Sequence, residues 1–265
     1  VNMIINSKDN EKIKYTKSLL KSKNRNKVKK FIIEGYRIVT LAIDCDAKLE
    51  YVFINEDFEN KKEHIELLEI LKSKNIKVYK TTNKLFENFI DTENTQGIIG
   101  VVKFNTNTLE SNFKKENKFV LVLDRIQDPG NMGTIIRTAD ACGVDLIIAL
   151  KGCVDIYNPK VIRSTMGSIF DMNIVYENQD EAINFLKNNG FSIVSSYLDT
   201  DNYYNNISYN NKTALVIGNE ANGINNDIIL NSDTLLKIPI YGKAESLNAA
   251  ISSAILMYEI KKFIL

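Results

Sequence analysis

Hydrophobic residues in the first hundred positions form short runs and longer periodic stretches that alternate along the chain. Short apolar runs predict strands at 31–33, 51–54, 76–79 and 97–102. Apolar residues at helical spacing predict helices at 11–22, 36–43, 61–74 and near 84–89. In the helix at 61–74, the residues expected on the buried face are Ile65, Leu67, Leu68 and Leu71. The alternation indicates an α/β domain.

The polar stretch at 105–117 interrupts this pattern, because it is rich in Asn, Thr, Ser and Lys and has no periodic apolar residues. We interpret it as a linker between a first domain at 1–104 and a second domain at 118–265. Both lengths are ordinary for a single domain.

The second domain opens with the unbroken apolar run 119–123, which is typical of a parallel strand buried on both faces. Further strands are predicted at 145–150, 191–195, 214–217 and 235–240, followed by a closing helix at 247–263. From this pattern alone we expect a layered α/β sheet of ordinary Rossmann-like topology. Ligands of such sheets bind at the carboxyl ends of the strands, and the unusual residues of this half lie there.

Composition sets limits on the chemistry. The chain has 265 residues, of which 44% are hydrophobic and 25% charged, as in ordinary globular proteins. Cys45, Cys142 and Cys153 stand at no metal-like spacing, and with the single His64 they offer no standard zinc site. We therefore expect no metal, and reduced thiols in a cytoplasmic protein. The sequence shows no signal-peptide core and no run approaching the roughly 20 apolar residues of a membrane span.

The net charge of +1 is unevenly distributed. Residues 1–30 contain ten basic side chains and two acidic ones, which gives this segment a net charge of +8. Such a segment attracts polyanions such as RNA, because each phosphate contact releases counterions. A lysine-rich helix that is merely solvated explains the same pattern, so charge alone leaves both readings open.

The first unusual loop, at 124–137, joins a predicted strand to a helix through Gly130 and Gly133. Glycines there let the backbone approach a ligand, and a helix N-terminus favours anions. A tight turn with Asn131 bonded to its own backbone is the simpler alternative. Arg137 lies among apolar residues, where a structural salt bridge is its simplest role. The loop lacks the GxGxxG pattern, which argues against a nicotinamide enzyme.

Two further loops follow predicted strands. The loop at 217–224 places Glu220 where its carboxylate can pair with an arginine or accept a ligand hydrogen bond. The segment at 238–250 ends a strand at Pro239, turns at Gly242 and leads into the last helix. Ser246 is the expected cap of that helix, and Asn248 the expected first-turn contact.

These three loops, in this order, resemble the three motifs of the SpoU, or TrmH, family of RNA ribose 2′-O-methyltransferases in the SPOUT superfamily, and in particular the bacterial 23S rRNA enzymes. The matching positions are Asn131, Gly133 and Arg137 in the first loop, Gly218-Asn219-Glu220 with Gly223 in the second, and Ile238-Pro239 through Glu245-Ser246-Leu247-Asn248 in the third. Residues 158–168 resemble the family's linker, and 31–37 and 92–97 resemble its ribosomal-protein-like RNA-binding module. The departures are small: Ile240 replaces a common Met, and Ala249 and Ala250 vary a small-residue pair.

The resemblance implies an α/β fold with a trefoil-knot SPOUT domain at 118–265, preceded by a smaller α/β RNA-binding domain at 1–104. It also implies a homodimer through the knotted domain, with sites built from both subunits, and S-adenosylmethionine as the cofactor. The implied cofactor-binding residues are Ile217, Gly218, Asn219, Ile238, Ile240, Ser246, Leu247 and Asn248. The implied catalytic residues are Arg137, Asn131, Glu220 and Asn248.

Arg137 is the residue to which we assign the chemistry. A free guanidinium stays protonated, so we expect Arg137 to stabilise the developing alkoxide and to hold an adjacent phosphate that accepts the proton. Asn131 is expected to orient the ribose or Arg137, and Glu220 to position one of these groups. The expected RNA-binding residues are Lys12, Lys14, Lys17, Lys21, Lys23, Arg25, Arg37 and Arg163.

Several alternatives remain open at this stage. The extra first domain favours 23S ribosomal RNA as the substrate, with transfer RNA as the second choice. A non-catalytic RNA-binding or ribosome-assembly factor, a methylase of a base nitrogen and an antibiotic-resistance methylase share parts of this architecture. The intact Asn131 and Arg137 favour an enzyme that acts on a ribose oxygen.

Overall fold

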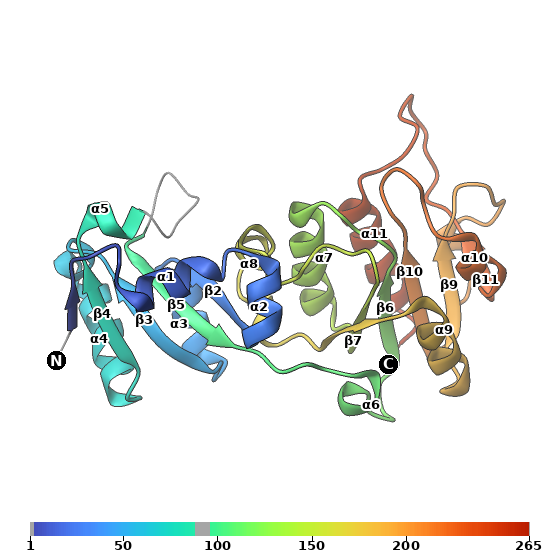
Figure 1. The fold of residues 1–265 in the computed structure, drawn as a ribbon. Helices are drawn as coiled ribbons and strands as arrows, with labels where there is room; N and C mark the ends of the chain where they lie inside the picture. Colours follow the sequence, from blue (N-terminus) through green and yellow to red (C-terminus); the bar gives the residue numbers. More distant parts are fainter. Residues whose placement is uncertain (1–2, 88–95, 265) are drawn as a thin grey trace. The chain divides into compact units, whose positions relative to one another are not determined.

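The computed structural model describes residues 3–87 and 96–264, and the chain divides into two compact units (Figure 1). Unit 1 comprises Val1–Asn105 and Tyr157–Phe170, and unit 2 comprises Thr106–Ile156 and Asp171–Leu265. This division differs from the expected one in two places. Residues 157–170 pack with unit 1 although they lie within the second predicted domain, and the predicted linker packs with unit 2 from Thr106 onward.

Unit 1 is built on a five-stranded sheet in the spatial order β1-β4-β3-β5-β2. Its strands are β1 (Met3–Ile5), β2 (Lys30–Glu34), β3 (Leu49–Ile54), β4 (Lys77–Thr81) and β5 (Ile98–Lys103). Strands β1, β4 and β3 are parallel to one another, whereas β5 runs antiparallel to both β3 and β2. All four strands predicted in this part are present, and β1 is an addition.

The helices of unit 1 include one segment from the second half of the sequence. They are α1 (Glu11–Ser18), α2 (Ser22–Val28), α3 (Tyr36–Asp44), the 3-10 helix η1 (Phe58–Asn60), α4 (Lys62–Ser73), α5 (Asn83–Phe86), α8 (Pro159–Thr165) and the 3-10 helix η3 (Ser168–Phe170). In α4 the buried side chains are His64, Leu67 and Leu71, whereas Ile65 is 46% exposed, so the predicted apolar face was partly wrong. Part of the predicted helix near 84–89 lies outside the described residues.

The helix predicted at 11–22 is interrupted after Ser18. The side chain of Asn24 donates to the carbonyl of Ser18, and the guanidinium of Arg25 donates to the carbonyls of Leu19 and Leu20 at 2.8 and 2.7 Å. These bonds satisfy carbonyl groups that a continuous helix would otherwise use, so a turn separates α1 from α2.

Unit 2 contains a six-stranded sheet in the order β11-β9-β10-β6-β7-β8, in which every neighbouring pair is parallel. Its strands are β6 (Phe119–Leu123), β7 (Leu146–Leu150), β8 (Ile174–Glu177), β9 (Ser192–Ser196), β10 (Thr213–Ile217) and β11 (Thr234–Leu236). Strands β6, β7 and β10 are buried along their whole length, as their unbroken apolar runs predicted. Strand β11 is shorter than predicted, because the chain leaves the sheet before Pro239.

The helices of unit 2 are α6 (Leu109–Asn112), α7 (Pro129–Cys142), α9 (Gln179–Asn188), the 3-10 helix η4 (Tyr204–Asn206), α10 (Asn226–Leu230) and α11 (Ala249–Lys261). Leu109 of α6 joins the main hydrophobic cluster of this unit, which explains why the predicted linker packs here. The long helices α7 and α11 pack side by side (Figure 1). None of the helices within the described ranges is long and apolar enough to cross a membrane.

Candidate active site

The three motif loops of unit 2 leave the same edge of the sheet. The first follows β6, the second follows β10 and the third follows β11, and these strands all run parallel within one sheet. The carboxyl ends of parallel strands meet at one edge, which is where ligands of such sheets bind. The sequence-predicted catalytic and cofactor-binding residues therefore come from one edge of one unit.

Helices α7 and α11 begin next to each other at this edge. The N-cap of α7 is Asp128, whose carboxylate accepts from the backbone N–H of Asn131 at 2.7 Å, and Pro129 opens the helix. The N-cap of α11 is Asn248. Our expectation that Ser246 caps this helix was wrong, because the helix starts two residues later than predicted and Ser246 lies in the exposed loop before it.

A chain of hydrogen bonds joins the three predicted polar residues. Asn248 uses its side-chain oxygen to cap α11, accepting from the backbone N–H groups of Ala250 and Ile251 at 2.9 and 3.3 Å. Its Nδ2 therefore faces outward and donates to Oδ1 of Asn131 at 2.9 Å. Nδ2 of Asn131 in turn donates to Oε1 of Glu220 at 2.8 Å. Every bond runs in the same direction and each polarises the next, so the helix cap fixes the orientation of both carboxamides.

Arg137 stands apart from this chain of hydrogen bonds. It is exposed on α7, and within the described ranges no carboxylate lies at ion-pair distance, so the salt bridge considered from the sequence is absent. It is six residues beyond Asn131, which places it about 9 Å further along the helix and about 120° around it. Within one copy of the chain, Asn131 and Arg137 therefore face different directions.

The second loop is held by groups that the sequence did not reveal as important. Arg125 is bonded to the carboxylate of Asp124 at 2.7 and 2.8 Å, and its Nη2 also reaches the carbonyl of Gly223 at 3.2 Å. This hydrogen bonding to Asp124 raises the pKa of Arg125. Asp124 also accepts from the backbone N–H of Asn225 at 2.7 Å. The sequence shows an acidic and a basic residue directly after the buried strand β6, but it does not indicate that both contact the second loop.

Asn219 is occupied with shaping this loop. It is 9% exposed, and its Nδ2 donates to the carbonyl of Arg125 at 2.8 Å while its Oδ1 accepts from the backbone N–H groups of Ala221 and Asn222 at 3.0 Å. Its side chain therefore mainly holds the loop in shape, and one of the two N–H groups of Nδ2 is not used in this network. At Gly218 an added Cβ would lie 2.4 Å from the backbone of Gly223, so this position needs glycine.

The third loop offers unused main-chain groups. Ile238, Pro239 and Ile240 are half-buried, and the residues from Tyr241 to Asn248 are exposed. Among the residues that the structure describes, no backbone–backbone hydrogen bond involves positions 238–247. Free N–H and C=O groups beside half-buried apolar side chains suit a nucleoside-containing cofactor, because main-chain groups can pair with an adenine edge while apolar side chains cover its faces. The predicted positions Ile238, Ile240 and Leu247 fit S-adenosylmethionine in this respect.

The basic residues of the N-terminal segment serve different purposes. Arg25 is 2% exposed and bonded to backbone carbonyls, so its assignment to RNA phosphates is corrected to a structural role. Lys12 lies 4.6 Å from the ring centroid of Tyr51, and Lys14 pairs with Asp9 at 2.9 Å. The exposed predicted residues without such a contact in the described ranges are Lys17, Lys21 and Lys23.

The structure brings Arg37 and Arg163 together although they are far apart in the sequence. Both line a cavity of about 370 Å³ in unit 1, with Gln96 and Met166. Arg163 also forms an ion pair with Glu34 at 3.5 Å. They meet because α8, which carries Arg163, packs against β2.

The cysteines and the single histidine form no metal site in the part of the chain that the structure describes. Cys45, Cys142 and Cys153 form no disulfide bond within the described ranges. Burial raises the pKa of Cys153 to about 11, and its Sγ donates to the carbonyl of Leu123. A thiol with this pKa is protonated near neutral pH and is a poor nucleophile.

Comparison with known protein families covers both units. The model of the SpoU rRNA methylase family matches residues 118–258, which is more than half of the chain. The model of the MRM3-like substrate binding domain matches residues 10–100. The substrate-binding match lies within the predicted first domain, 1–104, and the methylase match lies within the predicted second domain, 118–265.

Individual relatives support the same conclusion. The chain is 33% identical to the 23S rRNA (guanosine(2553)-2′-O)-methyltransferase of Bacillus subtilis, over 97% of this chain and 98% of that protein. Its structure matches the AdoMet-bound rRNA methyltransferase from Sinorhizobium meliloti with a TM-score of 0.87 at 28% identity, covering 99% and 98% of the two chains. The AdoMet complex of the SpoU methyltransferase AviRb from Streptomyces viridochromogenes matches with a TM-score of 0.84 at 25% identity, covering 96% and 98%. The predicted SPOUT fold class, enzyme class and cofactor are confirmed, and the chain belongs to the SpoU family of S-adenosylmethionine-dependent rRNA methyltransferases.

Proposed function

We propose that this protein transfers a methyl group from S-adenosylmethionine to a ribose 2′-hydroxyl of 23S ribosomal RNA. The observation that carries the proposal is the hydrogen-bonded chain from the α11 cap through Asn248 and Asn131 to Glu220. It unites one residue from each of the three motifs. The Bacillus subtilis relative is a guanosine 2′-O-methyltransferase of 23S rRNA, which supports 23S rRNA as the substrate and the ribose 2′-oxygen as the methylated atom.

Arg137 is the proposed catalytic residue. The reaction converts a neutral hydroxyl into an oxygen nucleophile, so negative charge develops on that oxygen. The guanidinium of Arg137 is exposed and has no ion-pair partner among residues 3–87 and 96–264, so it can donate to this oxygen and to a neighbouring phosphate, which accepts the displaced proton. Because a guanidinium does not lose its own proton at neutral pH, Arg137 acts as an electrostatic stabiliser.

Asn131, Asn248 and Glu220 are the proposed positioning residues. The α11 cap fixes Asn248, Asn248 fixes Asn131, and Asn131 holds one carboxylate oxygen of Glu220. The other oxygen of Glu220 is then directed by a rigid network and can accept a hydrogen bond from the ribose. Such preorganisation keeps the reacting oxygen aligned without reordering side chains during the reaction.

The proposed cofactor-binding groups lie on the second and third loops. Bound S-adenosylmethionine supplies an electrophilic methyl group on a sulfonium. Main-chain groups of Ile217, Gly218, Ile238, Ile240 and Leu247 hold it, and Ser246 and Asn248 are its side-chain neighbours. Asn219 gives the second loop its shape, and the second N–H of its Nδ2 is a further donor that the cofactor can use.

The active unit is proposed to be a homodimer joined through the knotted domain. Asn131 and Arg137 face different directions on α7, so a site that needs both takes one of them from a second copy. The exposed Ile251 and Tyr258, each 52% exposed, lie seven residues apart on α11 and form an apolar stripe suited to such an interface. Since the RNA substrate is made in the cytoplasm of bacteria, we place the protein there.

The RNA target can be tested with purified protein and labelled S-adenosylmethionine. The protein should methylate 23S rRNA in preference to 16S rRNA and transfer RNA, and reverse transcription at limiting nucleotide should stop at one position. Transfer to transfer RNA alone would overturn the choice of RNA.

Shared sites can be tested by mixing two impaired variants, Arg137→Ala and Asn131→Ala. If each site uses residues from both copies, half of the sites in a mixed dimer are intact, and re-formed mixtures should recover about a quarter of the wild-type activity. No recovery would mean that both residues act within one copy or that the chain works as a monomer.

A further inference from the structure

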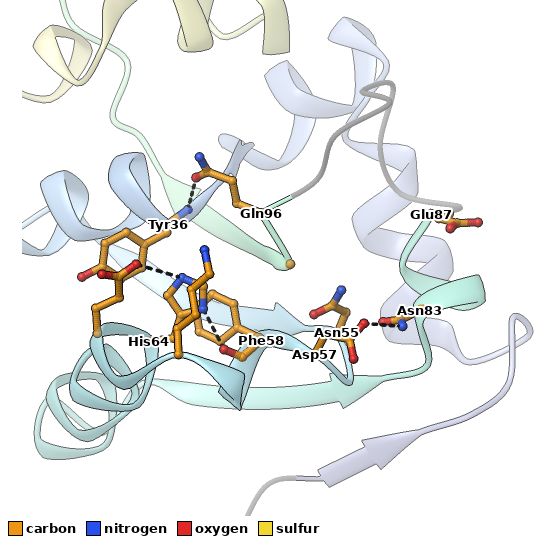
Figure 2. Close-up of a pocket in the computed structure, with 11 residues that line it drawn as sticks. Tyr36, Asn55, Asp57, Phe58, His64, Asn83, Glu87 and Gln96 are labelled. Carbon is orange, nitrogen blue, oxygen red and sulfur yellow. Dashed lines mark hydrogen bonds and ion pairs between the residues drawn. The ribbon is translucent and has the colours of Figure 1, made fainter.

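A second cavity, of about 520 Å³, lies in unit 1 at the edge where strands β3 and β4 end. Its walls come from the residues after β3, the starts of α3 and α4, the two ends of α5, and the two residues before β5 (Figure 2). None of the RNA-binding residues expected from the sequence lines it. Its volume is that of a small-molecule site and accommodates one nucleobase.

One side of the cavity is aromatic and rigid. The ring of His64 stacks on Phe58 with centroids 4.1 Å apart and 12° between the planes, and Tyr36 lies 4.9 Å from the ring of His64 on its other side. Nδ1 of His64 is bonded to the backbone carbonyl of Phe58 at 2.7 Å, which fixes the ring. Gln96 accepts from the backbone N–H of Tyr36 at 2.8 Å. The half-exposed Tyr36 therefore presents a fixed aromatic surface to a ligand.

The opposite side is rich in hydrogen-bond acceptors. The side-chain oxygens of Asn55 and Asn83 are buried and have no partner among the described residues. Nδ2 of Asn83 donates to one carboxylate oxygen of Asp57 at 2.7 Å (Figure 2). An added Cβ at Gly97 would lie 2.5 Å from the oxygen of Asn55, so glycine keeps that oxygen in place. Buried acceptors without partners cost free energy until a donor reaches them.

The charge of the cavity excludes phosphate as its ligand. Asp57, Glu63 and Glu87 line it, against the cation of Lys61 and the ring of His64. An RNA backbone would be repelled by this excess of carboxylates. Phosphate contacts instead suit the neighbouring cavity that holds Arg37 and Arg163.

We propose that this acidic, aromatic cavity binds one unpaired nucleobase of the RNA substrate, with guanine preferred over uracil. The proposal rests on the proposed function, since it concerns the same RNA. Unpaired bases are recognised by stacking on aromatic side chains and by hydrogen bonds to their edges. Guanine presents the N1–H and N2 amino donors side by side, which match carboxylate and carboxamide oxygens, whereas uracil presents a single N–H. Asp57 is the predicted specificity residue and Tyr36 the predicted stacking surface.

The test uses the full chain and two fluorescent RNA heptamers, one of uridine only and one with guanosine at the centre. Wild-type protein should bind the guanosine heptamer about tenfold more tightly, as expected for one well-matched base edge. Asp57→Asn removes the charge but can still accept from Asn83, so it should bring this ratio close to one while leaving the affinity for the uridine heptamer nearly unchanged. Tyr36→Ala should weaken binding of both heptamers, because stacking does not depend on the base.

The matched control is Glu66→Gln, which removes an exposed carboxylate of α4 outside the cavity. It should keep the wild-type ratio. An equal gain in affinity of Asp57→Asn for both heptamers would show a general charge effect, and an unchanged ratio would show that the base binds elsewhere; either result overturns the proposal. A Gly-Arg-Gly peptide should displace neither heptamer from the protein. Asp57-dependent binding of that peptide without base preference would overturn the proposal in favour of a protein partner.

Failure of this inference is distinguishable from failure of the proposed function. If the wild-type protein methylates 23S rRNA but shows no Asp57-dependent base preference, only the nucleobase site is wrong. If it methylates no RNA while the guanosine preference is present, the nucleobase site stands and the proposed reaction is wrong.

Discussion

Two regions gave the main functional signals in the sequence: the N-terminal basic segment, and the adjacent starts of α7 and α11. The structure supports the second signal better than the first. In the basic segment the signal was a count of charges, and several of those charges have local structural partners: Arg25 binds backbone carbonyls, Lys14 pairs with Asp9 and Lys12 lies over Tyr51. At the helix starts the signal was a set of positions. Asn131 and Asn248 are 117 residues apart in sequence and hydrogen-bonded in space. Charge density shows little about a side chain's role, whereas spaced polar motifs at strand ends identify groups that meet.

Removal of the Arg137 side chain should slow the reaction more than any other change considered below. Arg137→Ala should lower the rate constant of methyl transfer by about 100- to 1000-fold, because it removes the donor proposed to stabilise the developing alkoxide. Binding of S-adenosylmethionine, measured by calorimetry, should stay within about twofold. Normal methylation by a variant that binds cofactor and RNA normally would remove Arg137 from the mechanism.

The next largest effect separates a structural arginine from the arginine that we propose to be catalytic. Arg25→Ala leaves the carbonyls of Leu19 and Leu20 without their donor in a buried position, so it should destabilise unit 1 locally by about 2–3 kcal/mol. Hydrogen exchange of the amides in α1, α2 and β2 measures this. The exposed neighbour Lys23→Ala should change local stability by less than about 0.5 kcal/mol. Equal effects of the two variants would contradict the structural role of Arg25.

A smaller effect tests the direction of the hydrogen-bond chain. Asn248→Asp can still cap α11 but cannot donate to Asn131, and it places Asn131 between two carboxylates. We expect unchanged thermal stability and about tenfold slower methyl transfer. Asn10→Asp, at the cap of α1, changes a cap in the same way outside the site and should leave the rate unchanged. If Asn248→Asp slows methyl transfer and also lowers thermal stability, the role of Asn248 is to cap α11 and its hydrogen bond to Asn131 does not contribute to the rate.

The smallest effect concerns the remaining lysines. The double change Lys21→Ala and Lys23→Ala should weaken RNA binding about two- to fivefold and lower the salt dependence of binding by one to two phosphate contacts. Lys12→Ala should affect RNA binding less, because that ammonium lies over Tyr51. Anisotropy titrations with 23S rRNA fragments at several salt concentrations measure both. If Lys12→Ala weakens RNA binding more than the double change, Lys12 contacts RNA as predicted from the sequence, in spite of its position over Tyr51.

Much of the fold could be predicted because buried parallel strands have a direct sequence signature. The runs that form β6 and β10 are apolar throughout and occur where expected. The packing of α8 on unit 1 could not be predicted, because nothing in residues 159–165 records which sheet covers their apolar face. The knot also lies beyond pattern reading, since hydrophobic periodicity records which residues are buried but not the path of the chain.

The candidate site was predictable only in part. Asn131, Glu220 and Asn248 were recognised by motif, yet their bonding to one another depends on long-range packing of α7 on α11. Asp124 and Arg125 were missed as supports, because their partners lie in a loop about 100 residues away. The acceptors of the second cavity were invisible for the same reason, since Asn55 and Asn83 come from different elements.

The site on the sheet edge of unit 2 is proposed to methylate a ribose oxygen, and the position of the transferred methyl group on the RNA shows whether it does. Purified protein is incubated with 23S rRNA and S-adenosylmethionine labelled in the methyl group, and the RNA is then hydrolysed with alkali. A methyl group on a ribose 2′-oxygen blocks cleavage at that nucleotide, so the label should remain in an alkali-resistant dinucleotide and should be absent with Arg137→Ala. Label released in a methylated mononucleotide would show that the methyl group is not on a ribose 2′-oxygen. An alkali-resistant product that is undiminished in Arg137→Ala would show that Arg137 is not catalytic.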